Sequence, residues 1–560
     1  MAKRTRETTD SAARPLAIKR SRKEQAASTS TPKATKSVVT SQAANLPKPA
    51  TITDDKAKDE TAKKSLNGAP NTEAATTTTI QIITGSYERV LHGFTAAIPH
   101  TLITSHDNPD TTPEDASTPN ITFADTFLFN AHASAVRCLA LSPLSDDSPK
   151  VTLATGSTDE RINIYSLSTV PPRVTKHSSK PQLPTLHTTP IASNPKNREL
   201  GSLLHHSASI TNLYFPTRSK LLSASEDNSI TITRSRDWTP LSTIKAPIPK
   251  AQGRPSGDTA APGEVPCGIN AFAVHPSLKL MVSVSRGERC MRLWNLVTGK
   301  KAGVLNFGRS ILEAVNEGRF GSGEGRKVIW DEEGEEFCVG FERGVVVFGM
   351  DSKAKGKLVP VPRTKIQEVR YLPVQGEQKK ILAVSTEDGR VLFYDTGAFL
   401  PVSEKEAEKG EKEEKKEKKS KHDAEAIPAC PLLAQLGGPA AGITSRIKDF
   451  EILPLPLASS SPATTFIIVT ASSDGSTRLW TLSSSDLILS ASKEASADGG
   501  KKEGYSTAKQ VGTPIGTYAT GNRITCLKAF VMTGKPEDDD EEEETPNGDA
   551  ESSSSESDDE

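Results

Sequence analysis

Apolar and polar residues alternate with period two on both sides of a short polar turn in the stretch Leu221–Ile232. Two alternating runs joined by the acidic-polar residues Glu226–Ser229 predict a β-hairpin with one buried face. Related hairpins are predicted at 153–165, 382–394 and 469–480. A hairpin of this kind cannot bury its own faces, so its copies must stack on one another.

A second pattern, three apolar residues with the spacing V-x-x-V-x-F, recurs through the chain. The triplets are Val136/Leu139/Leu141, Ile210/Leu213/Phe215, Ile269/Phe272/Val274, Ile366/Val369/Tyr371, Ile447/Phe450/Ile452 and Ile524/Leu527/Ala529. A weaker copy of the whole repeat runs from Val328 to Phe348. Strands this short and numerous, with turn residues between them, predict an all-β architecture.

Composition separates a folded body from solvated segments. Only 35% of the residues are hydrophobic, whereas 25% are charged, which is lean for a single core of 560 residues. Residues 1–79 carry 15 Lys/Arg against 8 Asp/Glu, and residues 536–560 carry 14 Asp/Glu with no Lys or Arg. We therefore predict a disordered basic tail over 1–79 and a disordered acidic tail over 536–560. Insertions that break the repeat are predicted at 168–198, 247–266, 309–326 and 403–423.

The patterns that mark secreted, membrane and metal-binding proteins are missing from the sequence. Its six cysteines are scattered with no C-x-x-C pair, which argues against a disulfide framework or a zinc site and fits a reducing compartment. It has no apolar run of about 18 residues and no apolar signal-peptide core at its N-terminus, so we expect neither a membrane partner nor secretion. A basic cluster formed by Lys19, Arg20, Arg22 and Lys23 predicts a nuclear-localisation signal, with a merely solvated tail as the alternative.

The repeats resemble WD repeats. His132 precedes Asp159, and His206 precedes Asp227, by the strand–turn–strand distance of that family. The resemblance implies that a His, a Ser/Thr, a turn Asp and a third-strand Trp hydrogen-bond within a blade. These structural positions are His132, Thr155, Asp159, His206, Ser223, Asp227, Thr470, Asp474 and Trp480. Tyr165 and Thr233 stand where the Trp is usual, so the first two networks are expected to be incomplete.

The WD-repeat resemblance implies a β-propeller, and the repeats predict the number of its blades. Six repeats precede residue 482. Strands within 80–129 lack a first strand, and the strand at 523–530 lacks a following hairpin, so together they make one further blade. Such closure protects sheet edges that an open array exposes. We predict a seven-bladed WD-repeat propeller over 80–535, closed by the two ends of the chain.

A narrower resemblance rests on short segments spread over the blades. They are Gly85-Ser86-Tyr87-Glu88, Phe129-Asn-Ala-His132, Leu222-Ser-Ala-Ser-Glu-Asp227, Leu293-Trp-Asn-Leu-Val-Thr-Gly299 and Arg523-Ile-Thr-Cys-Leu527. These segments resemble the WD-repeat ribosome-assembly family of the fungal "maintenance of killer" protein and the animal p21-activated-kinase-interacting protein. The resemblance implies a nuclear, nucleolar assembly factor of the large (60S) ribosomal subunit, a monomer that docks other factors or ribosomal-protein-like placeholders within the precursor particle. The animal members imply an alternative role as an adaptor that inhibits a p21-activated kinase.

No set of residues predicts catalysis, a cofactor site or a metal site, so we expect a non-enzymatic protein. His132 and His206 are interpreted as structural, and the turn carboxylates are too dispersed for paired acid–base work. The tails offer more chemistry: the basic tail can neutralise rRNA phosphates, and the acidic tail suggests a histone-binding protein as a further alternative. Acidic neighbours make candidate phosphorylation sites of Ser552, Ser553, Ser554, Ser555 and Ser557. The partner-binding residues stay unknown at this level.

Overall fold

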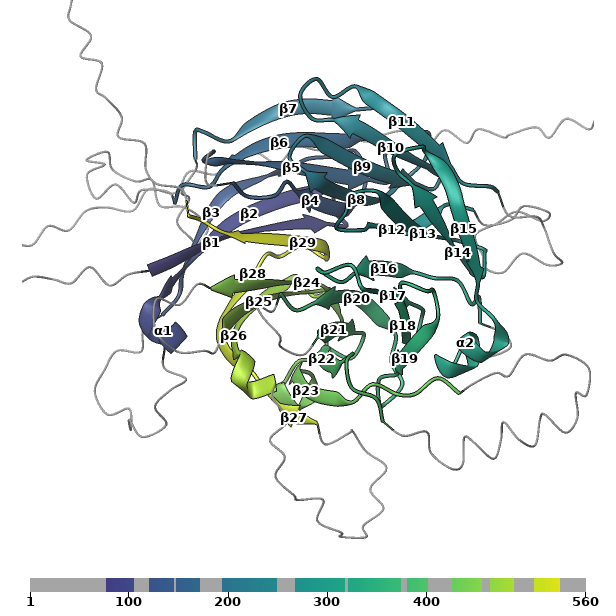
Figure 1. The fold of residues 1–560 in the computed structure, drawn as a ribbon. Coiled ribbons are helices and arrows are strands. Elements are labelled where there is room, and N and C mark those ends of the chain that lie inside the picture. The colour runs from purple at the N-terminus through teal and green to yellow at the C-terminus, as the bar shows by residue number, and fades with distance from the viewer. Residues whose placement is uncertain are drawn as a thin grey trace, which may run out of the picture. The chain divides into compact units, whose positions relative to one another are not determined.

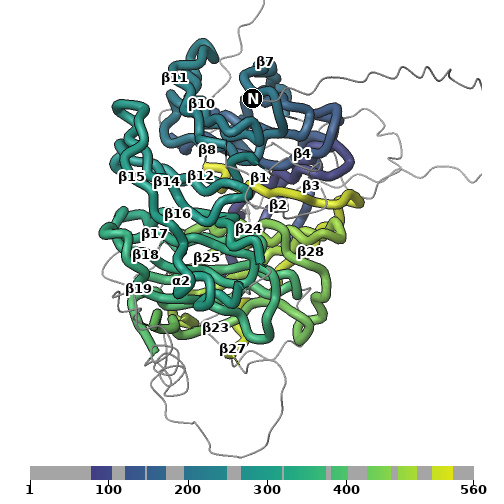
Figure 2. The backbone as a smooth tube through the Cα atoms, turned by 90° about the vertical axis from the view of Figure 1, so that its right-hand side faces the viewer, coloured from purple at the N-terminus to yellow at the C-terminus, as the bar shows by residue number. Residues whose placement is uncertain are grey.

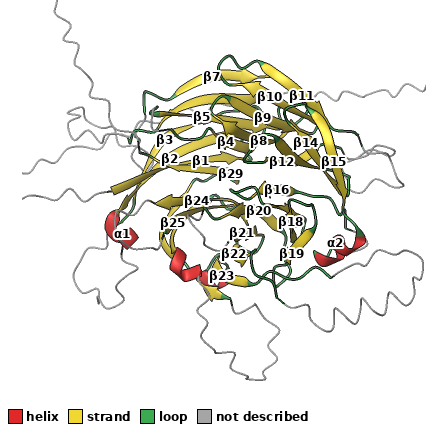
Figure 3. Ribbon diagram, viewed as in Figure 1, coloured by secondary structure: helices red, strands yellow, loops and turns green. Residues whose placement is uncertain are grey.

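The computed structural model describes residues 77–104, 120–145, 148–171, 194–248, 267–317, 321–373, 380–400, 426–455, 464–487 and 508–533. Nearly every element in these ranges is a β-strand (Figure 3). The helical elements are α1 (His100–Thr104), α2 (Arg309–Ala314) and the 3₁₀ turns η2 (Pro439–Ala441) and η3 (Ser484–Leu487). None of the helices described is long and apolar enough to span a bilayer.

Seven sheets surround a common centre, which confirms the predicted all-β, seven-bladed propeller (Figure 1). Blade 1 orders β29 (Ile524–Val531), β1 (Thr77–Ser86), β2 (Val90–Pro99) and β3 (Thr122–Asn130) from the centre outward. Blade 2 has β4 (Val136–Leu141), β5 (Lys150–Ser157), β6 (Ile162–Ser168) and β7 (Arg198–Leu203). Blade 3 has β8 (Ile210–Thr217), β9 (Lys220–Ser225), β10 (Ser229–Arg234) and β11 (Pro240–Lys245). Blade 4 has β12 (Ile269–Val274), β13 (Leu280–Ser285), β14 (Cys290–Asn295) and β15 (Lys300–Asn306).

The last three blades follow the same order. Blade 5 has β16 (Lys327–Trp330), β17 (Glu336–Gly340), β18 (Val345–Gly349) and β19 (Ala354–Leu358). Blade 6 has β20 (Ile366–Tyr371), β21 (Ile381–Thr386), β22 (Arg390–Asp395), β23 (Leu432–Gly437) and the short parallel edge strand β27 (Lys509–Gln510). Blade 7 has β24 (Ile447–Leu455), β25 (Thr465–Ser472), β26 (Ser476–Ser483) and β28 (Thr513–Ala519). Every other pairing between these strands is antiparallel, as in the hairpins β1–β2, β4–β5 and β8–β9.

Blade 1 is built from both ends of the propeller sequence. Its inner strand β29 pairs antiparallel with β1, so that Ile80 lies opposite Val531 and Ile83 opposite Lys528. Figure 2 shows β29, in yellow, beside the purple strands of the N-terminal hairpin. This pairing covers the inner edge of β1 and closes the ring.

The apolar triplets of the inner strands pack between blades. The buried hydrophobic residues of the described ranges form seven clusters, and each cluster joins two neighbouring blades. In one of them Ala224 and Ile230 of blade 3 meet Ile269 and Phe272 of blade 4. Burying a Phe or Ile side chain completely contributes roughly 2 kcal/mol. Stability therefore resides largely between blades, which is the physical reason that a single repeat cannot fold alone.

Three details differ from the sequence predictions. The first strand begins at Thr77 rather than after residue 79, because Thr77–Thr79 pair in register with residues 97–99. The closing strand is Ile524–Val531, one residue later than 523–530. The predicted insertion 309–326 contains α2, with Ile311 and Leu312 packed on the cluster between blades 4 and 5. The remaining insertions lie largely outside the described residues, 403–423 entirely, as does the acidic tail.

Candidate functional site

Blades 2 and 3 are each fastened by a histidine. His132 Nδ1 lies 3.1 Å from an Asp159 carboxylate oxygen, and its Nε2 lies 2.8 Å from Thr155 Oγ1. The carboxylate also accepts the Ala133 N–H at 2.9 Å. His132 precedes the inner strand β4, and Asp159 lies in the turn between β5 and β6. The contact therefore ties the segment before the first strand to the turn between the second and third strands.

The same arrangement recurs in blade 3. His206 Nδ1 lies 3.0 Å from Asp227, and its Nε2 lies 2.7 Å from Ser223 Oγ. Asp227 is followed by Asn228, which has a φ of 60°, a left-handed conformation that Asn tolerates better than most residues. Sequence and turn geometry thus agree, and the turn carboxylate faces back to the imidazole.

The pKa shifts of the paired histidine and aspartate side chains are consistent with a structural role. Burial lowers the pKa of His132, against the opposing pull of Asp159. Burial alone would raise the pKa of Asp159, but the Ala133 N–H and His132 outweigh it and the pKa falls. Hydrogen bonds from His206 and Ser229 likewise lower the pKa of Asp227 against its desolvation. A buried imidazole held on both nitrogens is poorly placed to exchange protons with a substrate.

Blades 4 and 7 use the complementary half of the WD-repeat network. Trp294 Nε1 donates to Ser283 Oγ at 2.8 Å in blade 4, and Trp480 Nε1 donates to Thr470 Oγ1 at 3.2 Å in blade 7. Neither blade has a His in place, and Ile443 fills that position in blade 7 with 5% exposure. A third-strand indole therefore secures the second strand where the imidazole is missing.

Arginines hold the turn carboxylates in blades 4, 6 and 7. In blade 4 Arg292 pairs with Glu288, and in blade 7 Arg478 lies 3.5 Å from Asp474. The Asp474 carboxylate also accepts the Ser476 N–H at 2.9 Å. The turn acid is thus paired with an arginine in both blades.

Blade 6 carries the most deeply buried of these arginines. Arg390, 2% exposed, donates through Nε to Asp388 at 2.7 Å and through Nη1 to the Val361 carbonyl at 2.9 Å. Thr386 Oγ1 bonds to the same carboxylate and lies 2.9 Å from the Arg390 carbonyl oxygen. Pro362, which stands at the histidine position, offers no side-chain donor, so Arg390 takes over the fastening.

A different set of polar residues lies at the centre of the ring, between the apolar residues of the inner strands. Most of them bond to the next blade. The neutral contacts are Asn212 Nδ2 to the Phe272 carbonyl (3.3 Å), Asn270 Nδ2 to the Gly325 carbonyl (2.9 Å) and Thr525 Oγ1 to the Val136 carbonyl (2.6 Å). The inner strands are therefore linked by polar bonds at the centre as well as by apolar packing.

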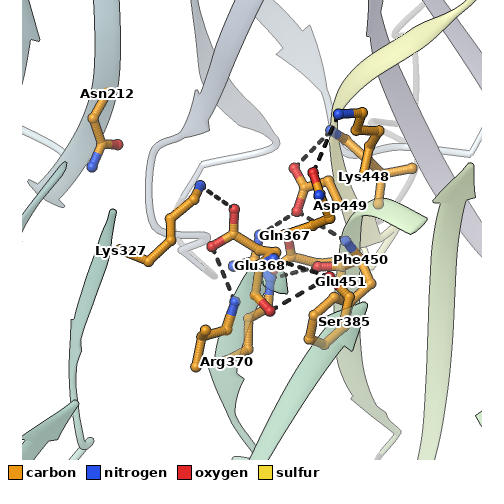
Figure 4. Close-up of polar contacts among 12 residues, drawn as sticks. Asn212, Lys327, Gln367, Glu368, Arg370, Ser385, Lys448, Asp449, Phe450 and Glu451 are labelled. Atoms are coloured by element: carbon orange, nitrogen blue, oxygen red, sulfur yellow. Dashed lines mark hydrogen bonds and ion pairs between the residues drawn. The ribbon is translucent and has the colours of Figure 1, made fainter. Parts of the chain in front are cut away.

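Arg370 of β20 organises the charged part of this centre. Its Nη2 lies 3.0 Å from Asp449 and 3.3 Å from Glu451 on β24, and its Nε bonds to the Phe450 carbonyl (Figure 4). Burial opposes the charged form, but the two carboxylates outweigh it and raise the pKa of Arg370. Asp449 also accepts the Leu527 N–H at 2.9 Å, which extends the network to β29.

Two lysines complete the central network. Lys327 of β16 pairs with Glu368 (Figure 4). Lys528 of β29 lies 2.9 Å from Glu451. Despite burial, Glu368 raises the pKa of Lys327. The central network, defined as Lys327, Glu368, Arg370, Asp449, Glu451 and Lys528, therefore holds three cations and three carboxylates, and is balanced in charge.

The central network was not predicted from the sequence, although a signal was present. The predicted inner strands rested on their apolar triplets, and the signal lies in the positions between them. Those positions hold Gln367, Glu368 and Arg370 on one inner strand and Lys448, Asp449 and Glu451 on the next. Arg370 and Glu451 carry opposite charges at matching positions of these adjacent repeats, which indicates contact at the centre of a propeller.

The two faces of the ring differ. One face, here the turn face, carries the hairpin turns with Asp159, Asp227, Asp388 and Asp474 and the first residues of the inner strands. The other, the cavity face, holds a cavity of about 700 Å³ where the inner strands end. Its lining includes Leu141, Leu213, Phe215, Leu453, Leu455 and Phe530, together with Glu451 and Lys528 of the central network.

Several predicted site residues lie outside the described ranges. They are the basic cluster Lys19, Arg20, Arg22 and Lys23 and the serines Ser552, Ser553, Ser554, Ser555 and Ser557. In the part of the chain that the structure describes, no group of three or more His, Cys, Asp or Glu side chains is placed to hold a metal ion. The histidines and turn acids that it does describe are brought together in pairs within blades, not in a shared pocket.

Comparison with known proteins agrees with this architecture. Residues 124–166 match the family model "WD domain, G-beta repeat", which spans β3 to β6. The chain is 28% identical over 428 residues to Protein MAK11 of Saccharomyces cerevisiae, covering 73% of this chain and 79% of that protein. It is 22% identical over 455 residues to the p21-activated protein kinase-interacting protein 1-like of Xenopus laevis, covering 81% and 83%. For the protein of the same description from Danio rerio the identity is 24% over 330 residues, with 59% and 65% covered.

Proposed function

We propose that this chain, which belongs to the WD-repeat family of these relatives, is a non-enzymatic scaffold for assembly of the large (60S) ribosomal subunit precursor. It acts in the nucleus and nucleolus by docking other assembly factors or ribosomal-protein-like placeholders. The observation that carries the proposal is the internal use of the ring's reactive side chains. His132, His206 and the turn acids form hydrogen bonds and ion pairs within their blades. The described residues therefore offer a partner a surface of defined shape and charge. A WD-repeat propeller is generally an interaction scaffold.

The tails support a ribosomal setting for this scaffold. The basic segment 1–79 and the acidic segment 536–560 have opposite charge on a chain of formal net charge −1. A basic segment neutralises rRNA phosphates in a salt-dependent manner, and an acidic one complements basic ribosomal proteins. The rRNA contact is assigned to the basic segment and the protein contact to the propeller.

Affinity purification of the tagged full chain at low salt tests the proposal. Sequencing of the co-purified RNA should find precursor rRNA of the large subunit enriched over mature rRNA, compared with an untagged strain. Recovery of mature ribosomes only, or of no ribosomal RNA, would reject the proposal. Raising the salt should weaken the RNA recovery, since phosphate contacts release counterions.

A second candidate function has support from the relatives' descriptions. Two relatives are described as p21-activated protein kinase-interacting proteins, so this chain is also a candidate inhibitor of such a kinase. Purified full chain added to an active p21-activated kinase distinguishes the two roles. Dose-dependent inhibition, without ribosomal precursor in the purification, favours the kinase; no inhibition together with precursor rRNA favours assembly. Histones in the same purification would instead favour the chromatin alternative.

A further inference from the structure

A ring of polar residues lies where the inner strands begin on the turn face. We call it the rim and define it as Arg137, Thr211, Asn270, Arg326, Gln367, Lys448 and Thr525. In six blades the rim residue is the second residue of the inner strand, and in blade 5 it immediately precedes β16. Three of the seven are cations and none is a carboxylate. Arg137, Asn270, Lys448 and Thr525 bond to a neighbouring blade, whereas Thr211 and Arg326 bond within their own blades.

The carboxylates next to the rim are outnumbered by cations. Glu226 is shared by Arg137 at 2.8 Å and Arg286 at 3.0 Å. Glu342 is shared in the same way by Arg326 at 3.3 Å and Lys365 at 2.9 Å. One carboxylate cannot neutralise two cations, so each of these triads leaves one positive charge in excess.

Lys448 adds a third excess charge. Its Nζ donates to Gln367 Oε1 at 3.2 Å, which is a neutral partner. Burial lowers the pKa of Lys448, and the nearby guanidinium groups of Arg446 and Arg523 lower it further. Arg446 itself lies 3.6 Å from Glu387, a pair without excess. The surroundings of Lys448 are therefore short of negative charge.

The excess is confined to the rim. A few ångströms further along the inner strands, the central network matches three cations with three carboxylates. A ligand anion gains most where cations lack partners, and it gains little where carboxylates already satisfy them. At the centre of the ring, the rim is thus the part where positive charges exceed negative ones.

We propose that the rim binds an acidic peptide segment of a partner protein, with its side-chain carboxylates on Arg137, Arg326 and Lys448. This inference rests on the proposed function as a docking scaffold and names the chemistry of one docked partner. The neutral rim residues Asn270, Gln367 and Thr211 can donate to and accept from peptide groups. A peptide with spaced acids places each carboxylate near a cation and its amides near these neutral side chains.

A nucleic-acid strand fits the rim less well. Glu226, Glu342 and Glu387 lie among the cations and would repel a continuous row of phosphates. Phosphodiesters also offer acceptors only, whereas the rim holds both donors and acceptors. An acidic peptide is the ligand class that the rim favours.

The test uses the full chain and a fluorescent peptide of about twelve residues with Glu at every third position. Wild-type protein should bind it saturably, and Arg137→Gln combined with Lys448→Gln should weaken binding about tenfold through the loss of two charge-assisted contacts. The matched control is Lys279→Gln with Lys300→Gln. It removes two exposed lysines of blade 4 that both lie at the strand ends away from the rim, and it should bind like wild type. Lys448→Arg should retain binding, and thermal unfolding checks that every variant is folded.

Three results would overturn the inference: no saturable binding, equal weakening by the control pair, or tighter rim-dependent binding of a single-stranded RNA of equal charge. Its failure is distinguishable from failure of the proposed function. If the peptide does not bind but precursor rRNA still co-purifies with the full chain, only the rim assignment falls. If the peptide binds at the rim but no precursor rRNA co-purifies, the ribosomal setting falls and the rim remains a peptide site.

Discussion

Blades 2 and 3 and blades 4, 6 and 7 solve one structural problem with different side chains. Each has an acidic residue in its hairpin turn whose carboxylate must be paired. Blades 2 and 3 use a buried histidine, as with His206 and Asp227, whereas blade 6 uses Arg390 on Asp388. The carboxylate is common to all of them and only its partner varies. In these five blades the acidic turn residue is kept, whereas the side chain that pairs with it differs.

The two solutions differ in how they depend on charge. A histidine fastening works with a neutral ring that donates from one nitrogen and accepts at the other. In an arginine fastening the cation keeps its charge at all accessible pH values, so the ion pair persists as long as the carboxylate is ionised, but both charges must be desolvated to be buried. We therefore expect the arginine blades to be the more sensitive to loss of the cation and the histidine blades to be the more sensitive to acid.

The largest effect is expected from Arg390→Met. The substitution leaves Asp388 and the Val361 carbonyl without their buried donor, so the free energy of unfolding should fall by about 3 kcal/mol. Urea unfolding followed by circular dichroism measures it. The matched control is Arg234→Met, which breaks the exposed pair with Asp237 and should cause no measurable loss. Equal effects of the two substitutions would contradict the assignment of Arg390 as a fastening.

His206→Ala should have the next largest effect. Two hydrogen bonds to Ser223 and Asp227 are lost and both partners remain partly buried, so we expect a loss of about 2 kcal/mol. Ser207→Ala, at the exposed neighbouring position, is the control and should leave the midpoint of urea unfolding unchanged. A histidine variant as stable as this control would show that blade 3 does not depend on its imidazole.

Trp294→Phe should have a smaller effect. The ring is kept in the cluster between blades 3 and 4, and only the indole N–H bond to Ser283 is lost, so about 1 kcal/mol is expected. Removing the hydroxyl as well, with Ser283→Ala, should add little in a double-mutant cycle because both changes delete the same bond. Fully additive losses would show that the bond does not couple the two strands.

Acid should weaken blade 2 before it weakens blade 4. Burial lowers the pKa of His132 below its usual 6.5, so near that pH the unfolded chain binds the proton more readily than the folded one. The stabilisation is complete above 6.5 and is lost as the pH falls from there through the folded pKa. The lowered pKa of Asp159 adds a separate loss below about 4. Hydrogen exchange of β5 amides at pH 7.5 and 5.5, with β13 amides as the internal control, measures the difference; an equal change in both strands would contradict it.

The strands of the propeller could largely be predicted from the sequence, whereas some outer strands and buried polar contacts could not. Period-two hairpins and apolar triplets such as Ile210/Leu213/Phe215 indicated the strands because buried positions must alternate. The outer strand β11 was not predicted, since nearly all of its residues are exposed and it shows no alternation. The fastening by Arg390 was not predicted either, because an arginine that follows a turn has the sequence pattern of a surface charge until its carboxylate and carbonyl partners are placed in space. Which side chain pairs with a given turn acid depends on such contacts between residues far apart in the sequence.

The most direct test of the scaffold role is a crosslinking map of the assembled protein. Tagged full chain, purified at low salt and treated with a lysine-reactive crosslinker, would be digested and its neighbours identified by mass spectrometry. The account predicts crosslinks from propeller lysines to assembly factors and proteins of the large-subunit precursor, with the basic segment 1–79 crosslinked to rRNA in a parallel ultraviolet experiment. Crosslinks confined to a protein kinase, to histones or to mature ribosomes would contradict it.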